Sequence, residues 1–169
     1  MQTDVTTLGI DPGTALLGYG IVTGSDPLRM IEYGAIETEP GESPAARLEV
    51  IYDALRDLIN EYSPDVVAVE QLFFARNTTT AIAVGQARGV ALLAAAKAGL
   101  VVYEYTPAEV KLAIAGYGNA DKRQVQEMVR TILGLDALPR PDDAADALAV
   151  SICHIFSSAF LEATGQGSR

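Results

Sequence analysis

The chain has very little of several residue types, and each shortage excludes something. It contains a single cysteine, Cys153, so an internal disulfide is impossible and nothing indicates an oxidising compartment. Its apolar runs are far shorter than the roughly 18 residues that a membrane span requires. The first residues lack the basic patch and apolar stretch of a signal peptide. We therefore expect a cytoplasmic protein without a membrane segment.

Basic residues are also scarce. The 12 Lys and Arg face 22 Asp and Glu, which gives a net charge of −10. Because phosphate binding depends on Lys and Arg, this balance taken alone argues against a nucleic-acid partner. The distribution qualifies the argument, since residues 70–130 hold seven basic and five acidic residues. Much of the acidic surplus falls in residues 47–61, which we expect to face away from any bound anion.

The chain is long and apolar enough for one folded domain. It has 169 residues, of which 49% are apolar, and a domain of this size buries roughly 70% of its unfolded surface. Neither an internal repeat nor a linker is visible. We expect one domain over residues 1–163 and a loose tail over 164–169.

The hydrophobic pattern predicts an α/β fold. Turn residues separate three short strands near the N-terminus, which indicates an antiparallel meander. Strands and helices then alternate, as in parallel βαβ units. The result is a mixed five-stranded sheet with helices on both faces. The expected strands are 7–11, 18–22, 28–36, 66–70 and 100–103, and the expected helices are 44–62, 78–98, 107–115, 120–133 and 142–163.

Acidic residues occupy positions at which ligand chemistry collects. Asp11 and Glu70 each close an apolar strand, and ligands of open α/β sheets bind beyond such strand ends. Asp143 and Asp146 are three residues apart in the last helix, so they share one face. Four adjacent carboxylates need cations to stay ionised. Hard oxygen ligands without a His or Cys cluster favour Mg²⁺ or Mn²⁺, and two such ions support phosphodiester hydrolysis.

Each acid also has a purely structural interpretation. Asp142 and Asp143 open a helix, where its dipole favours negative charge. Asp11 precedes Pro12 and Gly13, as a residue that starts a turn does. An apolar strand that ends in an acid, like the one before Glu70, is common. The argument for a metal site therefore depends on the set of four.

The sequence resembles the RuvC family of Holliday-junction resolvases. The resemblance covers about residues 7–154, with motifs in the order and spacing of the family. These are Leu-Gly-Ile-Asp-Pro-Gly at 8–13, Gly-Tyr-Gly at 18–20, Val-Glu-Gln-Leu-Phe at 69–73, Gly-Gln-Ala-Arg-Gly at 85–89 and Asp-Ala-Ala-Asp-Ala at 143–147.

The resemblance implies an RNase H-like fold and a homodimer that resolves four-way DNA junctions by two symmetric, Mg²⁺-dependent nicks. It implies 5′-phosphate and 3′-hydroxyl ends, a preference for a short T-rich sequence, and RuvA and RuvB as branch-migration partners. Carried over by position, the catalytic metal ligands are Asp11, Glu70, Asp143 and Asp146.

Two neighbouring residues complicate the last helix. Asp142 precedes the matched acid, so either Asp142 or Asp143 faces the metal; Asp143 is preferred because it keeps the spacing to Asp146. His154 lies about 16 Å further along the helix axis, too far to be a ligand, and we expect it to pack or to lie at the surface.

The resemblance also implies DNA contacts. It places Phe73 on the DNA, where an aromatic ring can stack on an unpaired base, although a ring beside a strand end is also a common core residue. Phosphate contacts are expected from Arg76, Lys111, Lys122 and Arg123. For Arg76 and Arg123, a solvated surface charge is the competing interpretation.

Three other functions fit parts of the pattern. A YqgF-type RNase H-like protein would act on RNA. The Asp-Pro-Gly-Thr segment resembles the phosphate loop of actin-type ATPases and sugar kinases, which need two such domains. A catalytically silent junction-binding module would not require the four acids.

Overall fold

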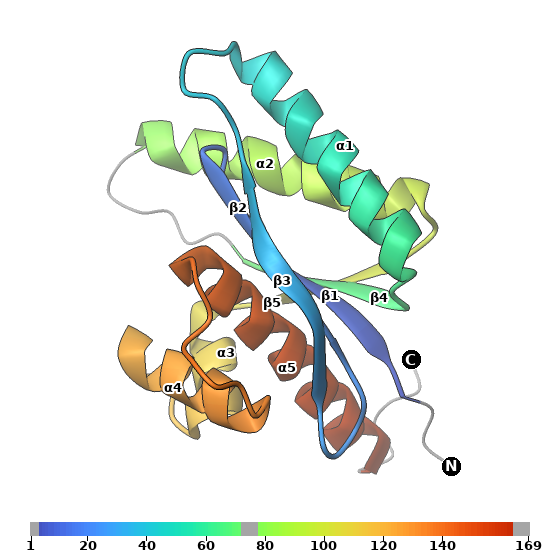
Figure 1. Ribbon diagram of the computed structural model, residues 1–169, viewed down its shortest axis with the longest axis vertical. Coiled ribbons are helices and arrows are strands. Elements are labelled where there is room, and N and C mark those ends of the chain that lie inside the picture. The colour runs from blue at the N-terminus through green and yellow to red at the C-terminus, as the bar shows by residue number, and fades with distance from the viewer. Residues whose placement is uncertain (1–3, 72–77, 164–169) are drawn as a thin grey trace.

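The computed structural model describes residues 4–71 and 78–163, in which strands and helices follow one another as the sequence pattern predicts (Figure 1). The strands are β1 (Thr6–Asp11), β2 (Leu16–Thr23), β3 (Arg29–Glu37), β4 (Val66–Glu70) and β5 (Val101–Tyr105). The helices are α1 (Pro44–Tyr62), α2 (Thr78–Lys97), α3 (Pro107–Ala115), α4 (Lys122–Ile132) and α5 (Asp142–Ala163).

The strands form one mixed sheet in the order β3-β2-β1-β4-β5. The first three strands are an antiparallel meander, and β4 and β5 join β1 in parallel. This topology confirms the predicted combination of a meander with βαβ units. It also places β1 and β4 side by side, so their carboxyl ends meet at one edge of the sheet.

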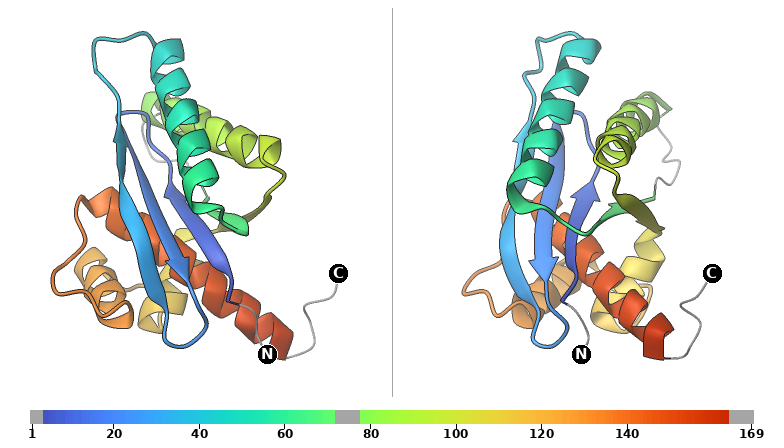
Figure 2. Two further views of the ribbon diagram at one scale, coloured as in Figure 1. Left: turned by 45° about the vertical axis from the view of Figure 1, so that its right-hand side comes forward. Right: turned by 90° about the vertical axis from the view of Figure 1, so that its right-hand side faces the viewer.

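Helices cover both faces of the sheet, as predicted. Figure 2 shows α1 and α2 on one side, with α3, α4 and α5 on the other. Leu8, Ile10, Val67 and Val69 belong to the core beneath α1 and α2. Ala68 belongs to the second core, which is built around α5.

Capping residues define where the helices begin. The Ser43 hydroxyl accepts a hydrogen bond from the Ala46 N–H at the start of α1. Thr106 and Glu109 form the predicted capping box of α3. A second capping box, which begins at Asp121, starts α4 at Lys122, so the predicted start at residue 120 was two residues early.

Helix α5 lies unusually close to the sheet because glycines of β1 and β2 leave room for its backbone. A Cβ added at Gly18 would lie 2.0 Å from the carbonyl oxygen of Asp143, and one added at Gly9 would lie 2.2 Å from that of Ala147. The hydroxyl of Ser151 donates to the carbonyl oxygen of Gly20 at 2.8 Å. Helix α5, which carries the candidate ligands Asp143 and Asp146, is thus fixed directly against β1, which carries Asp11.

By length and composition alone, α2 and α5 are each long and apolar enough to cross a membrane. Packing explains the apolar composition of α5, because 61% of its most apolar window is buried inside the protein, whereas only 22% of the corresponding window of α2 is buried. An apolar helix held between a sheet and other helices needs no membrane.

The close approach at Gly18 leads to a testable prediction. Replacing Gly18 by alanine forces backbone against backbone, which no rotamer change relieves, so we expect the free energy of unfolding to fall by about 3 kcal/mol or more. Urea denaturation measures it. The control is Gly41→Ala, because nothing lies within 4 Å of a Cβ at Gly41. Equal stability of the two variants would contradict the proposed packing.

Candidate active site

The alternation of side chains along the strands places Asp11 and Glu70 on the same side of the sheet. Successive residues of a strand point to opposite faces. Gly9 faces α5, and Asp11 follows two residues later on the same strand. Ala68 packs in the core around α5, and Glu70 again follows two residues later. Both carboxylates therefore lie on the α5 side, at the ends of adjacent strands.

The first turns of α5 bring the other acids to this edge. Asp11 pairs in register with Gly18 on β2, and the backbone of Asp143 lies directly over Gly18. Asp146 follows one turn later. The acids predicted from strand ends and helix spacing thus come together, although 135 sequence positions separate Asp11 from Asp146.

The pKa values of the acids show that too little positive charge lies near them. Burial, followed by three neighbouring carboxylates, raises the pKa of Asp11 from 3.8 to about 8. Those neighbours are Glu70, Asp146 and Asp143. Burial and Asp146 also raise the pKa of Glu70, whose carboxyl group hydrogen bonds with that of Asp11. Burial and mutual repulsion thus favour the protonated forms of Asp11 and Glu70.

Lys122, the first residue of α4, supplies part of the missing charge. Its Nζ lies 3.2 Å from Asp146 Oδ2 and 3.5 Å from Asp142 Oδ2. Burial opposes the charge on this ammonium, but the two aspartates outweigh burial and raise its pKa. For Asp146, burial raises the pKa while Lys122 opposes the rise.

The structure separates Asp142 from Asp143. Asp142 forms ion pairs with Arg140 and Lys122 at the rim. Burial is the largest single effect on its pKa and raises it, but Gln126 and the two cations together outweigh burial, so the pKa is lowered. Asp142 is absent from the carboxylates that raise the pKa of Asp11, whereas Asp143 is among them. This geometry favours Asp143 as the residue that faces the other acids.

The donor set suits a hard divalent ion. Within residues 4–71 and 78–163, no three Asp, Glu, His or Cys side chains are yet grouped closely enough to hold one ion. Asp146 instead pairs with Lys122. A half-buried group of carboxylates in which Asp11, Glu70 and Asp146 have raised pKa values fits Mg²⁺ or Mn²⁺, because these ions prefer oxygen donors and binding would displace protons.

A cavity of about 280 Å³ opens beside the acids, between α3, α4 and α5. Glu70, Asp146, Lys111 and Lys122 line it together with apolar side chains. The predicted phosphate-binding residues Lys111 and Lys122 are thus brought to the acids. The cavity combines negative groups for a cation with positive groups for an anion.

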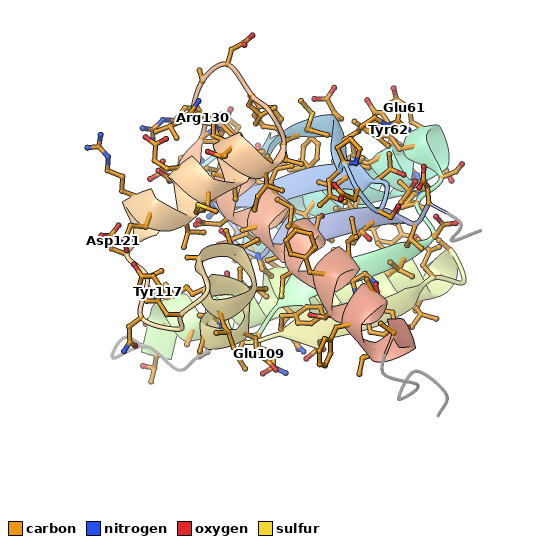
Figure 3. The ribbon with its side chains drawn as sticks, turned by 90° about the horizontal axis from the view of Figure 1, so that it is seen from below. Glu61, Tyr62, Glu109, Tyr117, Asp121 and Arg130 are labelled. Atoms are coloured by element: carbon orange, nitrogen blue, oxygen red, sulfur yellow. The ribbon has the colours of Figure 1, made fainter. Side chains whose placement is uncertain are left out.

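Arg123 lies elsewhere. It lines a second cavity, of about 410 Å³, with Tyr117 and Met128 between α3 and α4. Figure 3 shows the neighbouring Tyr117 and Asp121 at the outer side of these helices. The structure therefore does not bring Arg123 into the cavity that holds the acids. Phe73 and Arg76 lie outside the described residues.

The acidic helix lies on the other face, as expected. The exposed acids of α1, such as Glu49 and Asp57, belong to the layer opposite α5. His154 is buried, with 4% of its surface exposed, and packs against Tyr103 and Tyr105. It is thus a packing residue, one of the two placements expected.

Sequence reasoning missed the glycines beneath α5. Gly9, Gly18 and Gly20 are small residues at alternate positions on the α5 side of β1 and β2. That alternation is the signal that could have found them. Ion pairing of Lys122 with Asp142 and Asp146 was also missed, because it depends on the tertiary placement of α4.

Comparison with known proteins places the chain in a family. The family model described as "Crossover junction endodeoxyribonuclease RuvC" matches residues 7–154. A RuvC of Rubrobacter xylanophilus is 58% identical over 167 residues, which cover 98% of this chain and 93% of that protein. A RuvC of Chloroflexus aggregans is 56% identical over 159 residues, 94% of this chain and 97% of the relative.

Solved structures of Holliday junction resolvases also match this chain. The Thermus thermophilus RuvC in complex with a Holliday junction substrate matches with a TM-score of 0.87 and 40% identity, covering 96% of this chain and 97% of that one. A yeast mitochondrial Holliday junction resolvase, Ydc2, matches with a TM-score of 0.70 at 14% identity, over 94% of this chain and 82% of that one, and so shares the fold.

These matches bear out the resemblance in the motifs and the RNase H-like fold. They favour RuvC over a YqgF-type protein or an actin-type ATPase, because they extend over nearly the whole chain. With its acids gathered at one edge of the sheet, the chain belongs to the RuvC family of crossover junction endodeoxyribonucleases.

Proposed function

We propose that the chain resolves four-way DNA junctions by paired, symmetric hydrolysis of phosphodiester bonds at the cavity beside Asp11 and Glu70. The convergence of the acids of β1, β4 and α5 in a member of this family carries the proposal. The cytoplasm, where bacterial DNA lies, is the proposed place of action, and RuvA and RuvB are the proposed partners in branch migration.

The acids are proposed to hold the metal. Asp11, Glu70, Asp143 and Asp146 would bind two Mg²⁺ ions, for which Mn²⁺ would substitute. Two ions held in this way would activate a water molecule and stabilise the leaving oxygen. No covalent protein nucleophile is then required.

The basic residues are proposed to hold the substrate. Lys111 and Lys122 line the same cavity as Glu70 and Asp146, so they can bind the phosphate while the carboxylates hold the cations. Lys122 pairs with Asp146 in the free protein and is available for a phosphate once Asp146 binds a metal ion. Phe73 is proposed to stack on a base at the junction centre, with Arg76 and Arg123 on neighbouring phosphates.

The proposed activity requires both the divalent ion and Asp146. With Mg²⁺, we expect nicking of a synthetic four-way junction but not of linear duplex, no ATP hydrolysis, and loss of nicking with EDTA. Asp146→Asn should bind the junction but not cut it. The control is Asp136→Asn, an exposed acid before α5, which should cut normally. Cutting by Asp146→Asn would refute the role of Asp146 as a ligand. If the wild-type protein binds the junction without cutting it, the protein is the catalytically silent junction-binding module instead.

The two neighbouring acids of α5 should differ in importance. Loss of a partner behind a metal ligand lowers activity 10- to 100-fold, so removal of a ligand by Asp143→Asn should lower junction cleavage at least about 100-fold. Asp142→Asn should lower it less than about fivefold, because an exposed ion pair contributes less than about 1 kcal/mol. Single-turnover cleavage rates measure both. A larger loss for Asp142→Asn would exchange the two roles.

A homodimer is proposed through the small-residue ridge of α2, around Ala81–Gly89. Ile82 is 64% exposed, and nothing lies within 4 Å of a Cβ added at Gly89. Gly89 lies seven residues after Ile82, so the two share one helix face. An exposed apolar side chain beside an open glycine suits close packing against a second copy.

Blocking this ridge should separate the subunits without unfolding them. We expect Gly89→Trp to be a folded monomer in sedimentation equilibrium and to lose paired nicking, while the wild type is a dimer. Gly41→Trp adds the same ring at another open position, on the loop between β3 and α1, and should leave the dimer intact. A dimeric Gly89→Trp would place the interface elsewhere.

A further inference from the structure

A partly buried hydrogen bond joins α5 to the edge strand β5, and no step of the proposed function uses it. The hydroxyl oxygen of Tyr105 lies 2.8 Å from Nδ1 of His154. Only 4% of the His154 surface is exposed, and its ring packs on that of Tyr103 with centroids 4.4 Å apart. This contact is costly to break, because the ring nitrogen of the buried His154 would be left without a partner.

Tyr105 is directly connected to the candidate site through the backbone. It is the last residue of β5 and pairs in register with Glu70. Its carbonyl oxygen accepts a hydrogen bond from the N–H of Gln71 at 2.8 Å. The main chain of Tyr105 therefore lies beside Glu70 and binds the amide of the next residue, at the point where β4 finishes.

The acids of the site belong to two halves of the sheet that are fixed to α5 in different ways. Near β1 and β2, α5 lies on the glycines, and Ser151 donates to the Gly20 carbonyl oxygen. This contact sets the distance between Asp11 and Asp143. Glu70 lies on the next strand, beside β5. On that side, the link between Tyr105 and His154 ties the sheet to α5.

We propose that His154 and Tyr105 are positioning residues for Glu70. The hydrogen bond between His154 and Tyr105 sets where the end of β4 lies relative to the acids of α5. The proposal rests on the proposed function of the site. Neither residue touches the reacting atoms; both act through the backbone of β5 and β4.

The state of the imidazole suits a fixed structural link. Burial lowers the pKa of His154 to about 4, so the ring is neutral at physiological pH. The link therefore brings no further charge to a site in which carboxylates already repel one another.

Amide hydrogen exchange tests the proposal without reference to activity. The Gln71 amide reports on the end of β4 beside Tyr105. The Asp65 amide donates to the Thr6 carbonyl oxygen at 2.8 Å and reports on the other end of the strand. In Tyr105→Phe and in His154→Leu, we expect Gln71 to exchange about tenfold faster, the equivalent of one lost hydrogen bond. Asp65 should be unchanged.

Matched variants separate positioning from general stability. Thr23→Val removes the hydroxyl hydrogen bond between Thr6 and Thr23, which is 3.0 Å long and lies away from the acids, and should leave Gln71 protected. His154→Asn places a polar atom near the position of Nδ1 and should restore protection. The double variant Tyr105→Phe/His154→Leu should exchange no faster at Gln71 than either single variant, because all three lack the same bond.

Cleavage kinetics complete the test. Tyr105→Phe should lower kcat for a junction about tenfold with KM unchanged, since Glu70 is displaced while the DNA contacts remain. Unchanged exchange at Gln71, or equal acceleration at Gln71 and Asp65, would overturn the proposal. Absence of cleavage by the wild type would instead refute the proposed function, and the exchange result would still decide the role of His154.

Discussion

The close contact between the backbone of α5 and the sheet determines the geometry of the candidate site. Gly9 and Gly18 are bare on the α5 side of adjacent strands, and the carbonyl groups of Ala147 and Asp143 occupy the space that side chains would fill. A helix seated in this way cannot rotate or slide without a steric clash. Its acids are therefore set against Asp11 by excluded volume, before any charge interaction acts. On the β4 side, the hydrogen bond between His154 and Tyr105 is proposed to set the position of Glu70 relative to the acids of α5.

Local charge, and not the net charge of the chain, governs the chemistry at this edge. The carboxylates are half-buried and close together, and burial and mutual repulsion raise the pKa of Asp11 to about 8. Lys122 offsets part of this repulsion from the start of α4. A site in this state gains stability from each cation that enters it, which explains why an acidic protein can belong to a family of nucleases. Cations that neutralise the acids also reduce the repulsion that a phosphate would meet there.

Most of the fold was predictable because the pattern of the chain is local. Every strand and helix was expected close to its observed position, since alternation, periodicity and caps such as Ser43 act over a few residues. Asp11 and Glu70 were found by one topological rule, that the carboxyl ends of parallel strands share an edge. The resemblance then supplied the assignment of roles. Features that depend on the rotation of α5 were not predictable: the difference between Asp142 and Asp143, the partners of Lys122, and the contact between His154 and Tyr105 all join residues that are distant in the sequence.

The acidic face of α1 has a consequence for how the protein meets its substrate. Glu49 and Asp57 are exposed on one layer, and Lys111 and Lys122 line the cavity on the other. A polyanion that approaches the acids of α1 is repelled, while at the cavity Lys111 and Lys122 offset part of the repulsion from the carboxylates. The charges thereby favour one orientation of the approaching DNA before contact. This preference weakens as added salt shortens the range of the electric field.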